Sequence, residues 1–246
     1  MKKLFKLALM LITVCLLTIG APEIARAEGA QQAFKTVAVT DGNNRGAATL
    51  YGSGDNYITD LKVRVEFKNH APYEIALEDG YSPFIAALDF GAEDKLLFCS
   101  SQTGGSGGYG NYRIYRVKTD SYQLLYDDKT DSKAYTYRAR FLIGGFMDIY
   151  DCTTENDLIV HVGYMDGSFY DRIFNADGSL TGEQPYVNAV SFVSPALNPA
   201  SGVYRLITYR SVAAVAEVNR LGYIVNTLDF DGKAFTPSFT EFSIKL

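Results

Sequence analysis

Apolar and polar residues alternate along much of this chain with a period of two, which is the period of a half-buried β-strand. The clearest alternation is Leu61–Phe67, where leucine, valine and phenylalanine lie on one face and lysine, arginine and glutamate on the other. Similar short runs recur about every 10–15 residues with turn signals between them. The regular exchange of strands and helices that indicates a parallel sheet is missing. The pattern therefore predicts an all-β, antiparallel protein.

The best-defined predicted strands are Pro83–Phe90, Lys95–Ser101 and Tyr112–Val117, joined by a polar turn and then a glycine-rich loop. We expect a small or incomplete β-propeller-like domain. A twisted β-sandwich is the alternative, because the sequence shows no clean repeat period. A single all-β domain is expected over residues 28–246, with a weak boundary near residues 175–201.

Three further regions have less regular patterns, and each predicts a different local structure. Asp127–Lys133 is rich in charged residues and predicts a loop. Leu158–Tyr164 and Ser168–Phe174 flank an Asp-Gly dipeptide and predict a hairpin. Ser211–Arg220 is apolar at nearly every position, so a short helix and a buried irregular strand both remain compatible with it.

Residues 1–27 have the features of a secretory signal peptide. Three lysines fall within the first six residues, Leu7–Ile19 is an apolar run, and Ala25-Arg26-Ala27 forms a small-x-small cleavage site before Glu28. The apolar run is too short and too interrupted for a comfortable membrane span. We therefore expect an exported protein, secreted or associated with the cell envelope, and not an integral membrane protein.

The charge of the predicted mature chain limits its partners. Cleavage after residue 27 takes away four of the 23 basic residues and one of the 28 acidic residues, which leaves a formal charge of −8. Nucleic acids and anionic membrane surfaces are bound through basic patches. The charge therefore argues against both as partners.

Two cysteines remain after the predicted cleavage: Cys99 in a strand-like run and Cys152 just after one. Two cysteines in an exported protein permit a single disulfide between them. Two separate buried thiols are the alternative, since the sequence does not show whether their Cα atoms come within bonding range.

The glycine-rich loop is the candidate binding loop, and its residues are Gly104, Gly105, Ser106, Gly107, Gly108 and Tyr109. Its letters satisfy both G-x-S-x-G and G-x-G-x-x-G. A nucleophile elbow and a dinucleotide fold both need a helix after the loop, whereas Tyr112–Val117 is strand-like. A tight turn between strands is therefore the favoured interpretation.

The turn before this loop contains three acids, Asp89, Glu93 and Asp94, which can supply oxygen ligands to calcium. A solvated turn is the favoured alternative, because the D-x-D-x-D-G array is missing. Asp166, Asp177 and Asp231 each precede a glycine, as turn chemistry explains, and no pair of acids stands out as the paired carboxylates that glycoside hydrolysis needs.

Three segments, Leu88–Phe90 with Lys95–Phe98, Thr103–Tyr115 and Leu221–Val225, resemble motifs of one known family. They are similar to uncharacterised exported proteins of Gram-positive bacteria described as VCBS-repeat-like or FG-GAP-like. The resemblance implies propeller-like blades and calcium in the acidic loop. The chain departs from the family at Gly91–Asp94, where the loop is shortened and lacks the acidic alternation.

Two classes of function fit these observations. The first is a non-catalytic exported module that binds a partner, for example a cell-wall or surface component, or has a structural role. The second is an extracellular hydrolase that uses carboxylates on cell-wall glycan or polysaccharide. The first is favoured, because the sequence shows no catalytic constellation.

Overall fold

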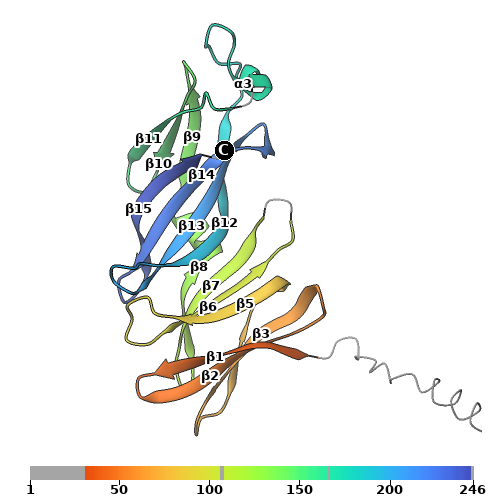
Figure 1. The fold of residues 1–246 in the computed structure, drawn as a ribbon, viewed down its shortest axis with the longest axis vertical. Helices are drawn as coiled ribbons and strands as arrows, with labels where there is room; N and C mark the ends of the chain where they lie inside the picture. Colours follow the sequence, from red (N-terminus) through yellow and green to blue (C-terminus); the bar gives the residue numbers. More distant parts are fainter. Residues whose placement is uncertain (1–30, 106–107, 166, 245–246) are drawn as a thin grey trace, which may run out of the picture. The chain divides into compact units, whose positions relative to one another are not determined.

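A computed structural model describes residues 31–105, 108–165 and 167–244. Within these ranges the strands form three antiparallel sheets (Figure 1). The all-β, antiparallel prediction is therefore confirmed, and the architecture is consistent with a β-sandwich or a propeller-like fold. The predicted signal peptide, residues 1–27, lies outside the described residues and stays a prediction. No helix in the described part is long and apolar enough to cross a membrane.

The N-terminal half forms an eight-stranded sheet in the order β1-β2-β3-β5-β6-β7-β8, with β4 also paired to β3. Its strands are β1 Gln32–Asp41, β2 Asn44–Ser53, β3 Tyr57–Phe67, β4 Tyr73–Ala76, β5 Gly80–Leu88, β6 Leu96–Gln102, β7 Gly110–Val117 and β8 Tyr122–Asp127. Strand β3 pairs with β5 only through Tyr57 and Ile58. This short connection lets β1–β4 fold over β5–β8.

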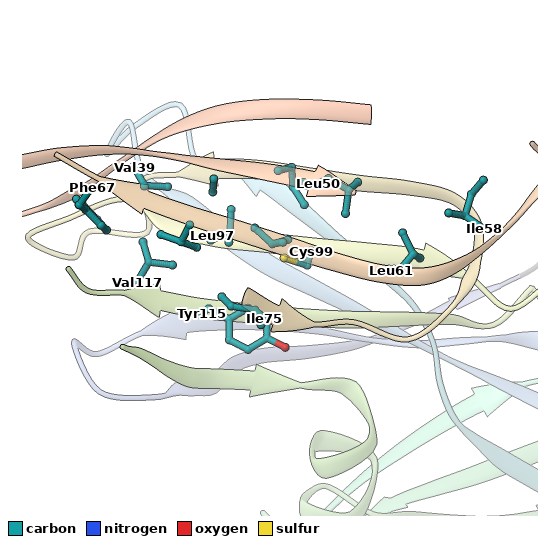
Figure 2. Packing of buried hydrophobic residues seen from close by; sticks show 14 residues of the cluster. Val39, Leu50, Ile58, Leu61, Phe67, Ile75, Leu97, Cys99, Tyr115 and Val117 are labelled. Atoms are coloured by element: carbon teal, nitrogen blue, oxygen red, sulfur yellow. The ribbon is translucent and has the colours of Figure 1, made fainter. Parts of the chain in front are cut away.

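The first apolar core lies between these two layers. Leu61, Val63, Val65 and Phe67 of β3 are all buried there, as their alternation predicts. Figure 2 shows Val39, Leu50 and Ile75 of the first layer packed with Leu97, Cys99 and Tyr115 of the second.

Strand β6 is buried on both faces. Leu97 and Cys99 lie in the first core, whereas Leu96 and Phe98 lie in a second core on the opposite face. Residues of the C-terminal sheet, among them Leu206 and Leu228, complete the second core. The strands β5–β8 therefore form a middle layer, which explains why β6 is a continuous apolar run and not an alternating one.

The C-terminal half contains the other two sheets, ordered β11-β10-β9 and β12-β13-β14-β15, which lie beside each other in Figure 1. Its elements are α2 Asp128–Ala134, β9 Tyr137–Leu142, β10 Phe146–Asp151, β11 Asn156–His161, α3 Gly167–Ile173, β12 Pro185–Leu197, β13 Tyr204–Ala214, β14 Ala216–Phe230 and β15 Phe235–Ile244. A third apolar core lies between the two sheets and α3.

Two sequence predictions are wrong, and both concern short helices. Asp127–Lys133 is not a loop, because the Asp127 carboxylate accepts the amides of Lys129 and Thr130 and caps helix α2. Ser168–Phe174 is not a strand but lies mostly in α3. Phe169, Tyr170, Ile173 and Phe174 share one face at helical spacing and enter the third core.

The ambiguous segment Ser211–Arg220 is strand. Strand β13 ends at Ala214 and β14 begins at Ala216, so the chain reverses at Val215. The φ angle of Val215 is 67°, a left-handed conformation that a β-branched residue rarely adopts. The reversal is held by pairing of β13 with β14 along their length.

The double burial of β6 generates a stability prediction. Leu97 is fully buried in the first core, so we expect Leu97→Ala to lower the free energy of unfolding by about 2–5 kcal/mol. The matched control is Leu124→Ala on β8, where the side chain is 47% exposed and the expected change is within about 0.5 kcal/mol. Urea unfolding followed by circular dichroism measures both. Equal losses in the two variants would contradict the layered core.

Candidate functional site

Two acids of the turn between β5 and β6, Asp89 and Asp94, accept hydrogen bonds from within the protein. The Asp94 carboxylate accepts hydrogen bonds from Thr40 Oγ1 at 2.8 Å and from the Gly42 amide at 3.0 Å, which fastens this turn to the β1–β2 turn. Asp89 accepts the Gly91 amide at 2.8 Å, and Glu93 is exposed. Among the described residues, no group of three or more His, Cys, Asp or Glu side chains is arranged to hold a metal ion. Calcium at this turn stays a prediction.

The glycine-rich loop is a closed turn between β6 and β7. Gly104 has a φ of 77° and faces the Tyr81 ring so closely that a side chain there would collide with it. The Tyr109 carbonyl accepts both the amide and the hydroxyl of Thr103, and the Gly105 carbonyl accepts the Gly108 amide. Ser106 and Gly107 lie outside the described residues. A binding role for the loop stays a prediction.

Cys99 and Cys152 are both free thiols in the structure and are not joined. Cys99 is buried in the first apolar core, and Cys152 follows β10 in another sheet. Burial raises the pKa of the Cys99 thiol far above its usual range, with Arg113 only partly opposing the effect. Cys99 is therefore a packed, unreactive side chain.

A buried band of polar residues, which we call the polar seam, crosses the inner face of the C-terminal sheet. Along β13, Leu206 belongs to the second core and Val212 to the third, and between them Thr208 and Arg210 point to the same face. Asn226 on β14 pairs in register with Thr208 and is fully buried. The polar seam comprises Tyr126, Asp131, Tyr137, Thr208, Arg210 and Asn226.

An ion pair forms the centre of the polar seam. Arg210 donates from Nη2 to Asp131 Oδ2 at 2.9 Å and to the Asp131 carbonyl at 3.0 Å, and the two side chains are only 2% and 5% exposed. The Arg210 guanidinium also lies 5.7 Å from the Tyr137 ring centre, and the Tyr137 hydroxyl donates to Asn226 Oδ1 at 2.9 Å. Four buried atoms of the seam have no hydrogen-bond partner in the structure: Tyr126 OH, Thr208 Oγ1, Arg210 Nε and Asn226 Nδ2.

Burial shifts the acids of helix α2. It raises the pKa of Asp131 to about 6, although Arg210 opposes the shift. It also raises the pKa of Asp128 to about 6, although the Tyr112 amide donates to the Asp128 carboxylate at 2.7 Å. Burial and the nearby charge of Asp131 raise the pKa of Tyr126 well above its usual value.

Helix α2 is held in place by a network of charges and hydrogen bonds. Its cap residue Asp127 pairs with Arg113 at 2.9 Å, and Arg113 pairs in turn with Glu78 at 2.8 Å. The pKa of Asp127 is lowered, because these bonds outweigh its partial burial. At the other side of the helix, Ser132 Oγ accepts the Val190 amide of β12 at 2.9 Å. These contacts fix the position of the helix, and the helix places Asp131 beside Arg210.

A cleft of about 360 Å³, here named the inter-sheet cleft, opens beside the polar seam. Its walls come from the β10–β11 turn, from β11 and from β15, and its described lining is Asp151, Thr154, Asn156, Leu158, Pro237, Ser238, Phe239 and Thr240. Thr240 pairs in register with Asn226, and the Tyr137 hydroxyl also bonds Thr240. The cleft and the buried seam are therefore adjacent.

The described lining of the inter-sheet cleft combines hydrogen-bonding residues with one aromatic residue. Phe239 is 59% exposed, and Asn156, Thr154 and Ser238 offer an amide and hydroxyls. Asp151 is the acid among the described lining residues, and its Oδ1 already accepts the amides of Thr153 and Thr154. This arrangement suits binding of a hydroxylated ligand, because a sugar has polar edges and an apolar face.

The fold and this cleft define an all-β protein with a polar cleft between two antiparallel sheets. Residues 135–243 match the model of the family described as the YybI C-terminal domain, which spans β9–β15 and the whole lining of the cleft. The chain is similar to the uncharacterized protein YybI of Bacillus subtilis (strain 168), with 22% identity over 173 residues. That alignment covers 68% of this chain and 66% of the relative, just under two thirds of its length. No solved structure matches the chain.

These similarities support an uncharacterised family of Gram-positive bacterial proteins, as the sequence predicts. Neither similarity carries the VCBS-repeat or FG-GAP description. Sequence reasoning also missed the polar seam. The available signal was the buried strand Leu206–Val212, where Thr208 and Arg210 occupy inward positions of an otherwise apolar alternation.

The raised pKa of Asp128 predicts a pH dependence of stability. The folded value of about 6 lies above the ordinary value of 3.8, so the stability linked to this group is fully present below pH 3.8 and is lost as the pH rises through 6. Asp128→Asn keeps an oxygen for the Tyr112 amide and removes the charge. We expect it to gain up to about 3 kcal/mol over the native protein between pH 4 and pH 7.

Urea unfolding at pH 4, 5, 6 and 7 measures this gain. The matched control is Glu93→Gln, an exposed acid in the β5–β6 turn, which should leave the pH profile unchanged. A parallel profile for Asp128→Asn and the native protein would contradict the burial of an ionised carboxylate at this position.

The buried ion pair predicts a non-additive effect on stability. Arg210→Met leaves the Asp131 carboxylate buried without its partner, so we expect a loss of about 3–5 kcal/mol at pH 7. Adding Asp131→Leu removes that unpaired charge and should recover most of the loss. Urea unfolding of both single variants and the double variant gives the coupling. A double variant no more stable than Arg210→Met would contradict the pairing.

Proposed function

We propose that this protein is an exported, non-catalytic binding module that holds a hydroxyl-rich ligand, a cell-wall or extracellular polysaccharide, in the inter-sheet cleft. The observation that carries the proposal is the lining of the cleft, which brings together amide, hydroxyl and carboxylate residues with one aromatic residue, Phe239. An aromatic ring packs against the apolar face of a sugar, while the polar groups bind its hydroxyls.

Binding is favoured over hydrolysis, because the described lining of the cleft contains too few acids for glycoside hydrolysis. Glycoside hydrolysis uses two carboxylates that flank the scissile bond. The described lining contributes Asp151 as its one acid, and the Oδ1 of that carboxylate accepts two backbone amides. The buried acids Asp128 and Asp131 belong to helix α2 and are not among the lining residues.

Two parts of the proposal, export and a role at the cell surface, rest on the sequence alone. The basic, apolar and small-x-small segments of residues 1–27 support secretion. The resemblance to VCBS-repeat-like or FG-GAP-like exported proteins supports a role at the cell surface. Export is tested by expressing the chain with and without residues 1–27 and locating it in medium and cell fractions. Equal retention of both forms in the cytoplasm would overturn this part of the proposal.

The cleft predicts retention by polysaccharide. In native gels containing a β-glucan, a xylan or purified cell-wall polysaccharide, we expect at least one polymer to slow the protein. Phe239→Ala should raise the dissociation constant about tenfold, because the ring supplies the stacking surface. Phe34→Ala is the matched control, since Phe34 is a 37% exposed ring on β1, far along the chain from the cleft.

Three results would contradict the proposal. The first is that no polymer slows the protein, and the second is that both phenylalanine variants lose affinity equally. The third is release of reducing sugar that Asp151→Asn abolishes, which would establish the hydrolase alternative.

A further inference from the structure

The outer face of the three-stranded sheet holds a second pocket, which we call the outer pocket. Along β10, Met147 and Ile149 point into the third core, so Asp148 and Tyr150 point to the opposite face. The pocket has a volume of about 330 Å³ and is lined by Arg138, Ala139, Arg140, Asp148, Tyr150 and Asp157. None of these residues lines the inter-sheet cleft.

Asp148 is the most unusual residue of the outer pocket, because it is a carboxylate that is only 3% exposed. Arg140 donates to its Oδ2 from both Nε and Nη2 at 2.8 Å. Its Oδ1 is buried and has no hydrogen-bond partner. A buried carboxylate oxygen without a donor costs free energy that a ligand with an N–H group can recover.

Arg140 covers Asp148 without being packed itself. Its side chain is 71% exposed, so its head can move aside without opening the core. A ligand that donates to Asp148 Oδ1 therefore needs only a change in a surface side chain. The strand pairing of Asp148 with Arg140 keeps the backbone that carries the carboxylate in place.

The next row of the same face supplies a positive group. Tyr150 pairs in register with Arg138 on β9 and with Asp157 on β11. The exposed Arg138 guanidinium lies 5.9 Å from the Tyr150 ring centre, which orients it across the pocket. Guanidinium groups bind carboxylates through two parallel hydrogen bonds.

The charges of the outer pocket balance, since two arginines face two aspartates. A polyanion would be repelled by the aspartates and a polycation by the arginines. A ligand with both charges, spaced along one small molecule, matches both rows of the sheet at once. An aromatic ring between the rows provides an apolar contact for the part of the ligand that joins the charges.

We propose that the outer pocket binds a small zwitterion, either an amino acid or a short peptide with both ends free, with its ammonium group on Asp148 and its carboxylate on Arg138. The ammonium donates to Asp148 Oδ1, and the carboxylate accepts from the Arg138 guanidinium. The site is independent of the polysaccharide proposal, because it lies on the other face of the three-stranded sheet.

Titration calorimetry of the full chain tests this proposal with alanine, dialanine, N-acetyl-dialanine and dialanine amide. We expect alanine or dialanine to bind, and the preferred length separates a free amino acid from a peptide. Each capped form should bind at least about tenfold more weakly, because it lacks one charge. Asp148→Asn and Arg138→Gln should each weaken binding about tenfold.

Two matched controls keep the test specific. Arg45→Gln changes an exposed arginine on β2, and Phe239→Ala changes the inter-sheet cleft, so neither should alter the affinity for dialanine. Arg138 is exposed, so its variant stays folded and interpretable even if Asp148→Asn does not. Absence of binding by alanine and dialanine, or equal binding of the capped forms, would overturn the proposal.

Discussion

The ion pair between Arg210 and Asp131 is the constraint on which the C-terminal half depends. A guanidinium that is 2% exposed is tolerated only with a carboxylate at hydrogen-bonding distance, and helix α2 must bring that carboxylate from 79 positions earlier in the chain. The cap on α2, its salt bridge to Arg113 and its contact with β12 all serve this placement. Helix α2 thus links the two sheets by electrostatics, because Asp127 pairs with Arg113 of the N-terminal sheet and Asp131 pairs with Arg210 of the C-terminal one.

The polar seam also separates two apolar cores that would otherwise merge along the inner face of β13. The inter-sheet cleft opens beside this separation, where Thr240 and Tyr137 continue the polar groups toward the surface. The family match begins at residue 135, one residue after α2 ends. The matched region therefore contains Arg210 but not its partner, which is supplied by the preceding segment.

The sequence predicted the strands well because burial on one face leaves a period of two, as in Leu61–Phe67. It failed at α2 and α3, since helices of seven residues give little periodicity and are fixed by a cap or by the third core. It also failed at the outer pocket and at the polar seam. Asp148 meets Arg140, and Thr208 meets Asn226, only because strand register brings them together, and register depends on the whole sheet. Of the residues visible as motifs, Asp89, Asp94 and Gly104 hold turns, and a calcium or binding role for the two segments stays a prediction.

The order of the strands has a consequence for how the protein folds. Within each sheet, apart from the connection at β3, where β4 and β5 both pair, each strand lies next to its neighbour in the chain. Most pairings therefore close short loops, and the entropy lost at each step is small. The middle layer is the exception in packing, because β6 needs both the folded-over β1–β4 layer and the distant C-terminal sheet to cover it. Within each sheet the pairing is thus mostly local, whereas the two faces of β6 are covered only through contacts between segments far apart in the chain.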